Sequence, residues 1–182
     1  ATTVSGSDST KTVTIDASAM NEGKALVLNN LAAAAVVTAG ADVDASGMTT
    51  QLEVATAGSS AHIIVAGSGG DLITAGTKGM IDTVTGGSGL DSFTVNAGTS
   101  SSPVTVNIID LGNGSDSEVL MVGSRATANV TMAGDWIATS DSANSGAVYI
   151  TTSTFNVDLS SASGPKGYAV TSDSSSATTV TI

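Results

Sequence analysis

The sequence predicts an all-β fold, a parallel β-roll or β-solenoid, and three observations support this prediction. Thr, Ser, Val, Gly and Asp dominate the 182 residues, whereas Lys, Arg and Glu, which favour helices, are scarce. Glycine-rich units of similar sequence follow one another between residues 57 and 94. Short runs rich in Val, Ile and Thr recur along the rest of the chain, separated by turn residues.

The pattern divides the chain into two regions, 1–98 and 99–182. In the first, IDASAM at 15–20 is echoed by VDASGM at 43–48, and an alternating apolar segment follows each. These segments predict strands and turns in earlier coils of the same solenoid. The second region predicts further β-structure that contributes assembly contacts. Its strand-like runs lie at 104–110, 118–122, 128–132, 147–151, 154–159, 167–171 and 178–182.

The charge balance favours a divalent cation as ligand. Sixteen acidic residues face five basic ones, so the formal charge is −11, and the basic residues form no cluster. Nucleic acid is therefore an unfavourable partner. Carboxylates that lie close together repel each other, and bound calcium relieves this repulsion. The chain has no cysteine and a single histidine, His62, which argues against a zinc site. No apolar run reaches the ~20 residues needed to span a membrane.

The repeats carry a specific motif. The units read AGSSAHIIV (57–65), AGSGGDLIT (66–74), AGTKGMIDTVT (75–85) and GGSGLDSFT (86–94). The last matches the pattern GGxGxDxUx, in which U is a large apolar residue, at every position. These units resemble the RTX family, the hemolysin-type calcium-binding repeat proteins, whose repeats wind a parallel β-roll with two units per coil.

The resemblance implies calcium sites between alternate units, which lie on the same side of such a roll. Units two and four would supply Asp71 and Asp91, with the turn residues Gly67, Gly69, Gly86 and Ser88. Glycine suits these turns because it allows positive φ and leaves the carbonyls accessible to an ion.

Units one and three predict a weaker second site at Asp82. His62 takes the place of the acid in unit one, and unit three carries an insertion before Asp82. A general base is an alternative role for His62, but no GxSxG or HExxH motif accompanies it. We expect instead an exposed side chain on a turn, and we expect that the protein is not an enzyme.

A third candidate metal site is the turn at 110–116. It combines Asp110, Asn113 and Asp116 with two glycines, and Glu118 follows. Calcium could bind here. A β-hairpin with a type I′ turn at Asn113–Gly114 is the alternative.

The resemblance also implies a function. Proteins with such repeats are secreted, often by the type I route, and similar turns occur in bacterial surface proteins. We expect a calcium-stabilised extracellular structural protein of a surface layer, filament or biofilm matrix, at the bacterial cell surface. TKTVTI at 10–15 is echoed by ATTVTI at 177–182, which predicts self-association end to end. The alternatives are an adhesin or carbohydrate-binding module that recognises cell-surface polysaccharide, and the non-catalytic RTX part of a larger secreted hydrolase or toxin.

Overall fold

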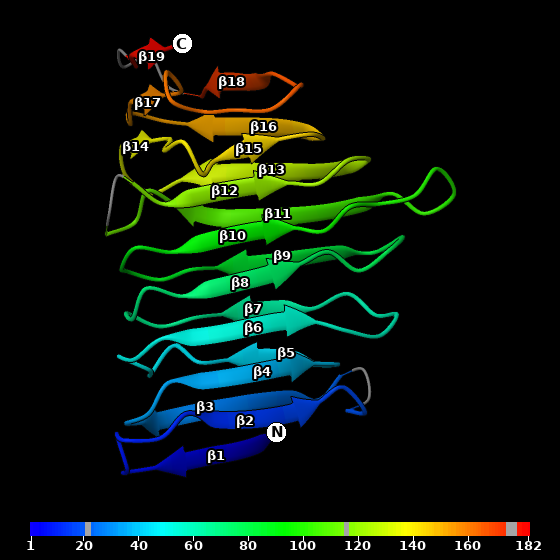
Figure 1. Cartoon of the computed structure of the whole chain (residues 1–182), viewed down its shortest axis with the longest axis vertical. Coiled ribbons are helices and arrows are strands. Elements are labelled where there is room, and N and C mark those ends of the chain that lie inside the picture. Colours follow the sequence, from blue (N-terminus) through cyan, green and yellow to red (C-terminus); the bar gives the residue numbers. More distant parts are fainter. Residues whose placement is uncertain (21–22, 115–116, 174–177) are drawn as a thin grey trace.

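The computed structural model describes residues 1–182 except 21–22, 115–116 and 174–177. Throughout these described residues the regular elements are β-strands, and no helix is present. The strands stack along one long axis, with the N-terminus near one end and the C-terminus near the other (Figure 1). The predicted fold class, an all-β parallel solenoid, is confirmed.

Two large parallel sheets form the walls of the solenoid. In the described residues, sheet A contains nine strands and sheet B contains seven. The strands of sheet A are β1 (Thr2–Gly6), β3 (Ala25–Leu31), β5 (Asp42–Asp44), β7 (Ile63–Val65), β9 (Ile81–Thr85), β11 (Val104–Leu111), β13 (Ala126–Met132), β16 (Ala147–Thr152) and β18 (Tyr168–Ser172). The strands of sheet B are β2 (Val13–Ala17), β4 (Ala35–Ala39), β6 (Leu52–Thr56), β8 (Leu72–Ala75), β10 (Ser92–Val95), β12 (Val119–Val122) and β15 (Ala143–Asn144).

Consecutive strands alternate between the two sheets up to β12, so two strands complete one coil. Two sets of turns result, one on each side of the solenoid (Figure 1). We call those that lead from sheet A into sheet B the A-to-B turns; they include 66–71, 86–91 and 112–118. The B-to-A turns include 57–62, 76–80, 96–103 and 123–125, and we count 164–167 with them because Ser163 bridges to Ala143 of β15 in sheet B and β18 of sheet A follows. Alternate sequence units therefore lie on the same side, as predicted.

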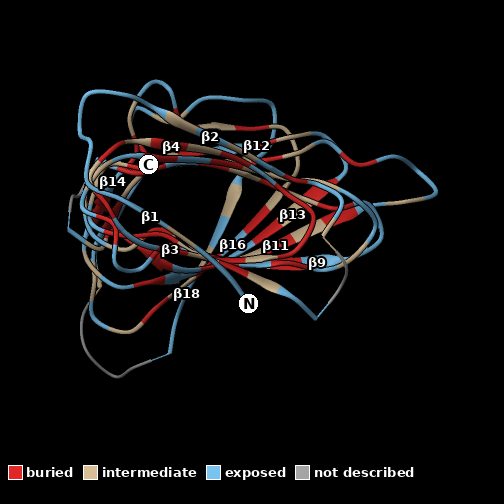
Figure 2. Ribbon diagram, turned by 90° about the horizontal axis from the view of Figure 1, so that it is seen from below, coloured by how far each residue is buried: buried red, intermediate tan, exposed pale blue. Residues whose placement is uncertain are grey.

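The core is a thin layer between the facing sides of sheets A and B (Figure 2). The apolar position of each repeat unit points into it, because side chains alternate between the two faces of a strand. Phe93 lies in register with Ile73 on one neighbouring strand and with Leu120 on the other. All three are almost fully buried. The burial of apolar surface, which contributes about 25 cal/mol per Å², is the main stabilising contribution along this stack.

The region after residue 98 continues the same sheets. β11 pairs with β9 before it and with β13 after it. The predicted runs at 104–110, 118–122, 128–132, 147–151 and 167–171 correspond to β11, β12, β13, β16 and β18. The alternative of a hairpin at Asn113–Gly114 is wrong, because β11 and β12 belong to different sheets.

A third, short sheet was not predicted as a separate sheet. Sheet C consists of β14 (Trp136–Ile137), β17 (Val157–Asp158) and β19 (Val180–Thr181). It gives the C-terminal coils a third wall and buries Trp136 completely. The described residues contain no helix of the length and hydrophobicity needed to cross a membrane.

Candidate functional site

Acidic side chains gather in the A-to-B turns and are buried there. Asp71, Asp91 and Glu118 each precede a strand of sheet B and occupy the same register position on successive coils. Their exposed fractions are 0%, 1% and 0%. Asp110, at the end of β11, is buried beside them. Glu118 was not predicted as a site residue, although it follows the candidate turn at 110–116.

Backbone N–H groups bind most of the carboxylate oxygens of this cluster. Asp71 accepts hydrogen bonds from the N–H of Leu52 (2.7 Å) and of Gly67 (3.2 Å). The N–H of Asp71 donates in turn to Oδ1 of Asp91 at 2.7 Å. These bonds connect one coil to the next at the point where the strands begin. The aspartates therefore also hold the coils in register.

Asp110 and Glu118 bind the turns in the same manner. Asp110 accepts hydrogen bonds from the N–H groups of Gly86 (2.9 Å) and Gly87 (2.7 Å). Oε2 of Glu118 accepts one from the N–H of Gly112 at 2.6 Å. Three turns are thus linked through acidic side chains.

Among the described residues, two carboxylate oxygens of the cluster are buried and have no hydrogen-bond partner: Oδ2 of Asp91 and Oε1 of Glu118. Burial raises the pKa of Asp91 to about 7; the N–H of Asp71 partly opposes this, and the charges of Asp71 and Asp110 add to it. Burial likewise raises the pKa of Glu118 to about 8, against the N–H of Gly112, and the charges of Asp91 and Asp110 add to it. Burial also raises the pKa values of Asp71 and Asp110. The ionised cluster is therefore unfavourable without a cation.

The turn residues predicted as ligands lie beside these acids, but their polar groups are largely engaged. The carbonyl of Gly67 accepts a hydrogen bond from the N–H of Ser88 at 3.0 Å. The N–H of Gly86 donates to Asp110, and Gly69 lies against the backbone of Thr50 on the preceding coil. Asn113 donates from Nδ2 to the carbonyl of Gly87 at 2.7 Å. Asp116, also predicted, lies outside the described residues.

The donor atoms of this cluster suit a calcium ion, but the present distances between its acidic side chains do not. The donors are oxygens, two of them are buried and unpartnered, and the nearest charges are negative. Within the described part of the chain, however, no group of three or more acidic or histidine side chains is close enough to hold a metal ion. Residues that could hold calcium are Asp91, Glu118 and Asp110, with Asp71 as their neighbour.

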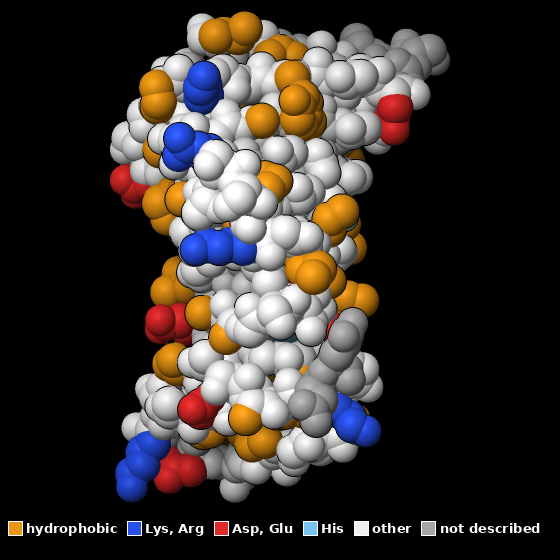
Figure 3. Space-filling model, turned by 90° about the vertical axis from the view of Figure 1, so that its right-hand side faces the viewer, with side chains coloured by type: hydrophobic (Ala, Val, Ile, Leu, Met, Phe, Trp, Pro, Cys, Tyr) orange, Lys and Arg blue, Asp and Glu red, His pale blue; other side chains and the backbone are white. Residues whose placement is uncertain are grey.

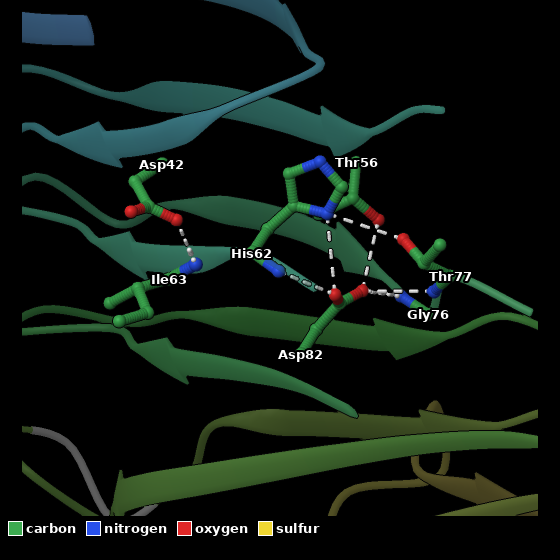
Figure 4. A network of polar contacts seen from close by, with 7 residues as sticks. All are labelled: Asp42, Thr56, His62, Ile63, Gly76, Thr77 and Asp82. Atoms are coloured by element: carbon green, nitrogen blue, oxygen red, sulfur yellow. Dashed lines mark hydrogen bonds and ion pairs between the residues drawn. The ribbon is translucent and has the colours of Figure 1, made fainter. Parts of the chain in front are cut away.

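The opposite side of the solenoid holds a further buried acid, Asp82, in a different environment (Figure 4). Its Oδ1 accepts a hydrogen bond from the N–H of His62 at 2.9 Å and lies 3.3 Å from Nδ1 of the same ring. Its Oδ2 accepts bonds from the N–H groups of Gly76 and Thr77, both at 2.9 Å, and from the hydroxyl of Thr56 at 3.3 Å. Both oxygens are therefore satisfied by the protein.

The expectation that His62 is an exposed turn residue is wrong. Its side chain is buried, with an exposed fraction of 1% for the residue, because its ring packs over Asp82 and contacts Thr77. Nδ1 lies between the Asp82 carboxylate and the Thr77 hydroxyl, whereas Nε2 is buried without a partner. An imidazole ring thus stands next to the acid at the position where an intact unit would place a second carboxylate.

Comparisons with protein-family models, with curated proteins and with solved structures found no match for this chain.

Proposed function

We propose that this protein is a calcium-stabilised extracellular structural protein with RTX-type repeats. The observation that carries the proposal is the pair of buried, unpartnered oxygens on Asp91 and Glu118 in a cluster of four acids. Such a cluster is unfavourable when ionised, and a divalent cation with flexible oxygen coordination would relieve it.

In this proposal the acidic residues have different roles. Asp91 and Glu118 supply the free oxygens, and Asp110 and Asp71 tie the turns on both sides to the same cluster. Bound calcium supplies positive charge that compensates these acids. Asp82 has a smaller part, because protein donors already satisfy both of its oxygens.

The coupling explains an extracellular location. A cation that binds only the folded chain stabilises it by mass action. Calcium is scarce inside cells and abundant outside, so the repeats would become most stable after export. The proposal includes no catalytic step.

Self-association is the second part of the proposal. The echoed segments 10–15 and 177–182 contribute β2 and β19, which lie at opposite ends of the stack (Figure 1). Parallel strands that repeat along one axis favour contacts that continue head to tail, which produce filaments or lattices. Electron microscopy of the purified chain with calcium tests this part: ordered fibres or sheets support it, and a persistent monomer contradicts it.

Thermal unfolding tests the calcium part. The midpoint of the wild-type chain is expected to rise with calcium, and Asp91→Asn combined with Glu118→Gln is expected to remove most of that rise. In chelator the double variant is expected to be at least as stable as the wild type, because neutral amides replace buried charges.

The exposed Asp141 provides a matched control, and Asp141→Asn is expected to leave the calcium response unchanged. A wild-type melting curve that is identical in calcium and in excess chelator would refute the proposal.

A further inference from the structure

Three neighbouring hollows lie on the outer surface of the C-terminal half of sheet A, away from the acidic cluster. The first is a hollow of about 630 Å³ that contains Arg125 and Lys166 together with hydroxyl groups of Thr99, Thr127 and Ser145. These residues come from successive B-to-A turns and the strand starts beside them. The space-filling view of this side shows basic side chains spaced along its upper part (Figure 3).

Two further hollows extend the first one across the sheet. A hollow of about 290 Å³ shares Lys166 and adds Tyr149 and Tyr168. A third, of about 440 Å³, shares Tyr149 and adds Asn107 and Asn129. Because each hollow shares lining residues with the next, we treat them together as the sheet A groove.

The charge of the groove is opposite to that of the whole chain. The chain has a formal charge of −11 and five basic residues, and two of these five line the groove. Among the described residues that line the three hollows, none is acidic. Arg125 and Lys166 form no ion pair within the described part of the chain. The groove therefore offers unpaired positive charge to a ligand.

Arg125 has an unusual backbone for a residue with a side chain. Its φ is +56°, a left-handed conformation that glycine or asparagine adopts at lower cost. It is the only arginine in the chain. A charged side chain at a position that favours glycine is an outlier of the kind found at binding sites.

The remaining lining suits sugar hydroxyls and sugar rings. Asn107, Asn129 and Tyr149 lie in register on β11, β13 and β16, so they follow each other at about 4.8 Å. Nδ2 of Asn129 donates to Oδ1 of Asn107 at 3.0 Å, which leaves the amide N–H groups of Asn107 and the carbonyl of Asn129 for a ligand. Tyr149 is 54% exposed and presents an aromatic ring beside them.

We propose that the sheet A groove binds an acidic polysaccharide. The carboxylate or sulfate groups of the polymer contact Arg125 and Lys166, which lie two coils apart, or about 10 Å. Its sugar rings lie against Tyr149, and its hydroxyl groups bind the two asparagines. A polynucleotide fits less well, because its closely spaced phosphates require more than two cations on a chain of strongly negative charge.

Isothermal titration of the full chain with a short oligouronate tests this proposal, in calcium and with circular dichroism to verify folding. Arg125→Asn keeps a residue that accepts the left-handed backbone, and it is expected to weaken binding about fivefold or more, as is Lys166→Gln. Tyr149→Ser is expected to weaken binding by a similar factor. Lys78 lies in a B-to-A turn outside the groove, so Lys78→Gln is the matched control and is expected to change nothing.

Further ligands separate the sources of recognition. An oligosaccharide with the same sugar backbone that carries sulfate in place of carboxylate groups shows which anion the groove prefers. Tighter binding of either one supports the proposal. Equal affinity for the carboxyl-reduced, neutral oligosaccharide would overturn the role of Arg125 and Lys166. Equal affinity for oligoglutamate would show that the site recognises charge alone and would overturn the glycan assignment. Equal loss in Lys78→Gln would show non-specific attraction. A melting curve without a calcium response would leave this result unaffected, because the groove shares no residue with the acidic cluster.

Discussion

At the scale of single residues, the buried acids differ in how completely their carboxylate oxygens are hydrogen bonded. Asp91 and Glu118 keep one buried oxygen each without a partner, whereas Asp82 has donors for both oxygens. The difference between the two aspartates arises at Oδ2, because in Asp82 this oxygen accepts hydrogen bonds from the N–H groups of Gly76 and Thr77 and from the Thr56 hydroxyl. In the part of the chain that the structure describes, no donor binds the remaining oxygens, Oδ2 of Asp91 and Oε1 of Glu118. The acidic cluster is thus the part of the molecule most sensitive to protons and cations.

This sensitivity predicts the pH dependence of stability in chelator. The folded-state pKa of Asp91 is about 7 and that of Glu118 about 8, against ordinary values of 3.8 and 4.5. The folded chain therefore holds protons that the unfolded chain releases, and the free energy of unfolding is expected to fall as pH rises from about 4 to about 8. Each pKa unit corresponds to about 1.4 kcal/mol.

Melting temperatures at pH 5 and pH 8 in chelator measure this effect. The wild type is expected to melt at a lower temperature at pH 8, and Asp91→Asn with Glu118→Gln is expected to flatten the difference. Calcium is expected to flatten it as well, since it favours the ionised form. A melting temperature that rises from pH 5 to pH 8 in chelator would contradict the assignment of these raised pKa values.

At the scale of elements, the turns stack as closely as the strands. An added Cβ at Gly87 would overlap the carbonyl oxygen of Gly67 on the preceding coil, and its φ is +89°. Gly58 has nearly the same φ, +90°, but nothing lies within 4 Å of its Cβ position. The two glycines therefore separate backbone strain from steric contact between coils.

The substitutions Gly87→Ala and Gly58→Ala test the importance of turn stacking. Gly58→Ala is expected to cost about 1 kcal/mol of folding free energy from the strained backbone alone. Gly87→Ala carries the same strain and also separates two turns of the acidic cluster, so we expect a cost of about 3 kcal/mol or more. Urea unfolding measures both values. Equal costs for the two variants would show that the turns do not need their close contact.

The elements also show how much the sequence could predict. The repeat units predicted strand positions, because their glycines and apolar residues recur at a fixed spacing, and their resemblance to RTX repeats implied that alternate turns lie on the same side. The runs predicted at 154–159 and 178–182 contain β17 and β19, but their pairing in a separate sheet C was not predicted, and neither was β14, because strands of two residues carry no periodicity. Glu118 was not predicted as a site residue because its turn, 112–118, is longer than 86–91 and hides the common register with Asp91. The burial of His62 depends on Asp82, which lies on the next coil and not nearby in the sequence.

At the scale of the whole molecule, each coil contacts mainly the coils before and after it. β10 pairs with β8 and β12, and β4 pairs with β2 and β6. Stability in such a stack is close to a sum of coil and neighbour contributions. A local change in the acidic cluster is therefore expected to fade with distance along the axis.

Amide hydrogen exchange tests this distribution. Calcium is expected to slow exchange most in β8, β10 and β12, which directly follow Asp71, Asp91 and Glu118, and least in β2 and β4 at the N-terminal end. The physical reason is that the free energy of cation binding enters at the A-to-B turns and reaches distant coils only through successive neighbours. The variant Asp91→Asn with Glu118→Gln is expected to lose the protection in β10 and β12 specifically. Uniform protection from β2 to β18 would instead contradict a local effect and would indicate a solenoid that opens as one cooperative unit.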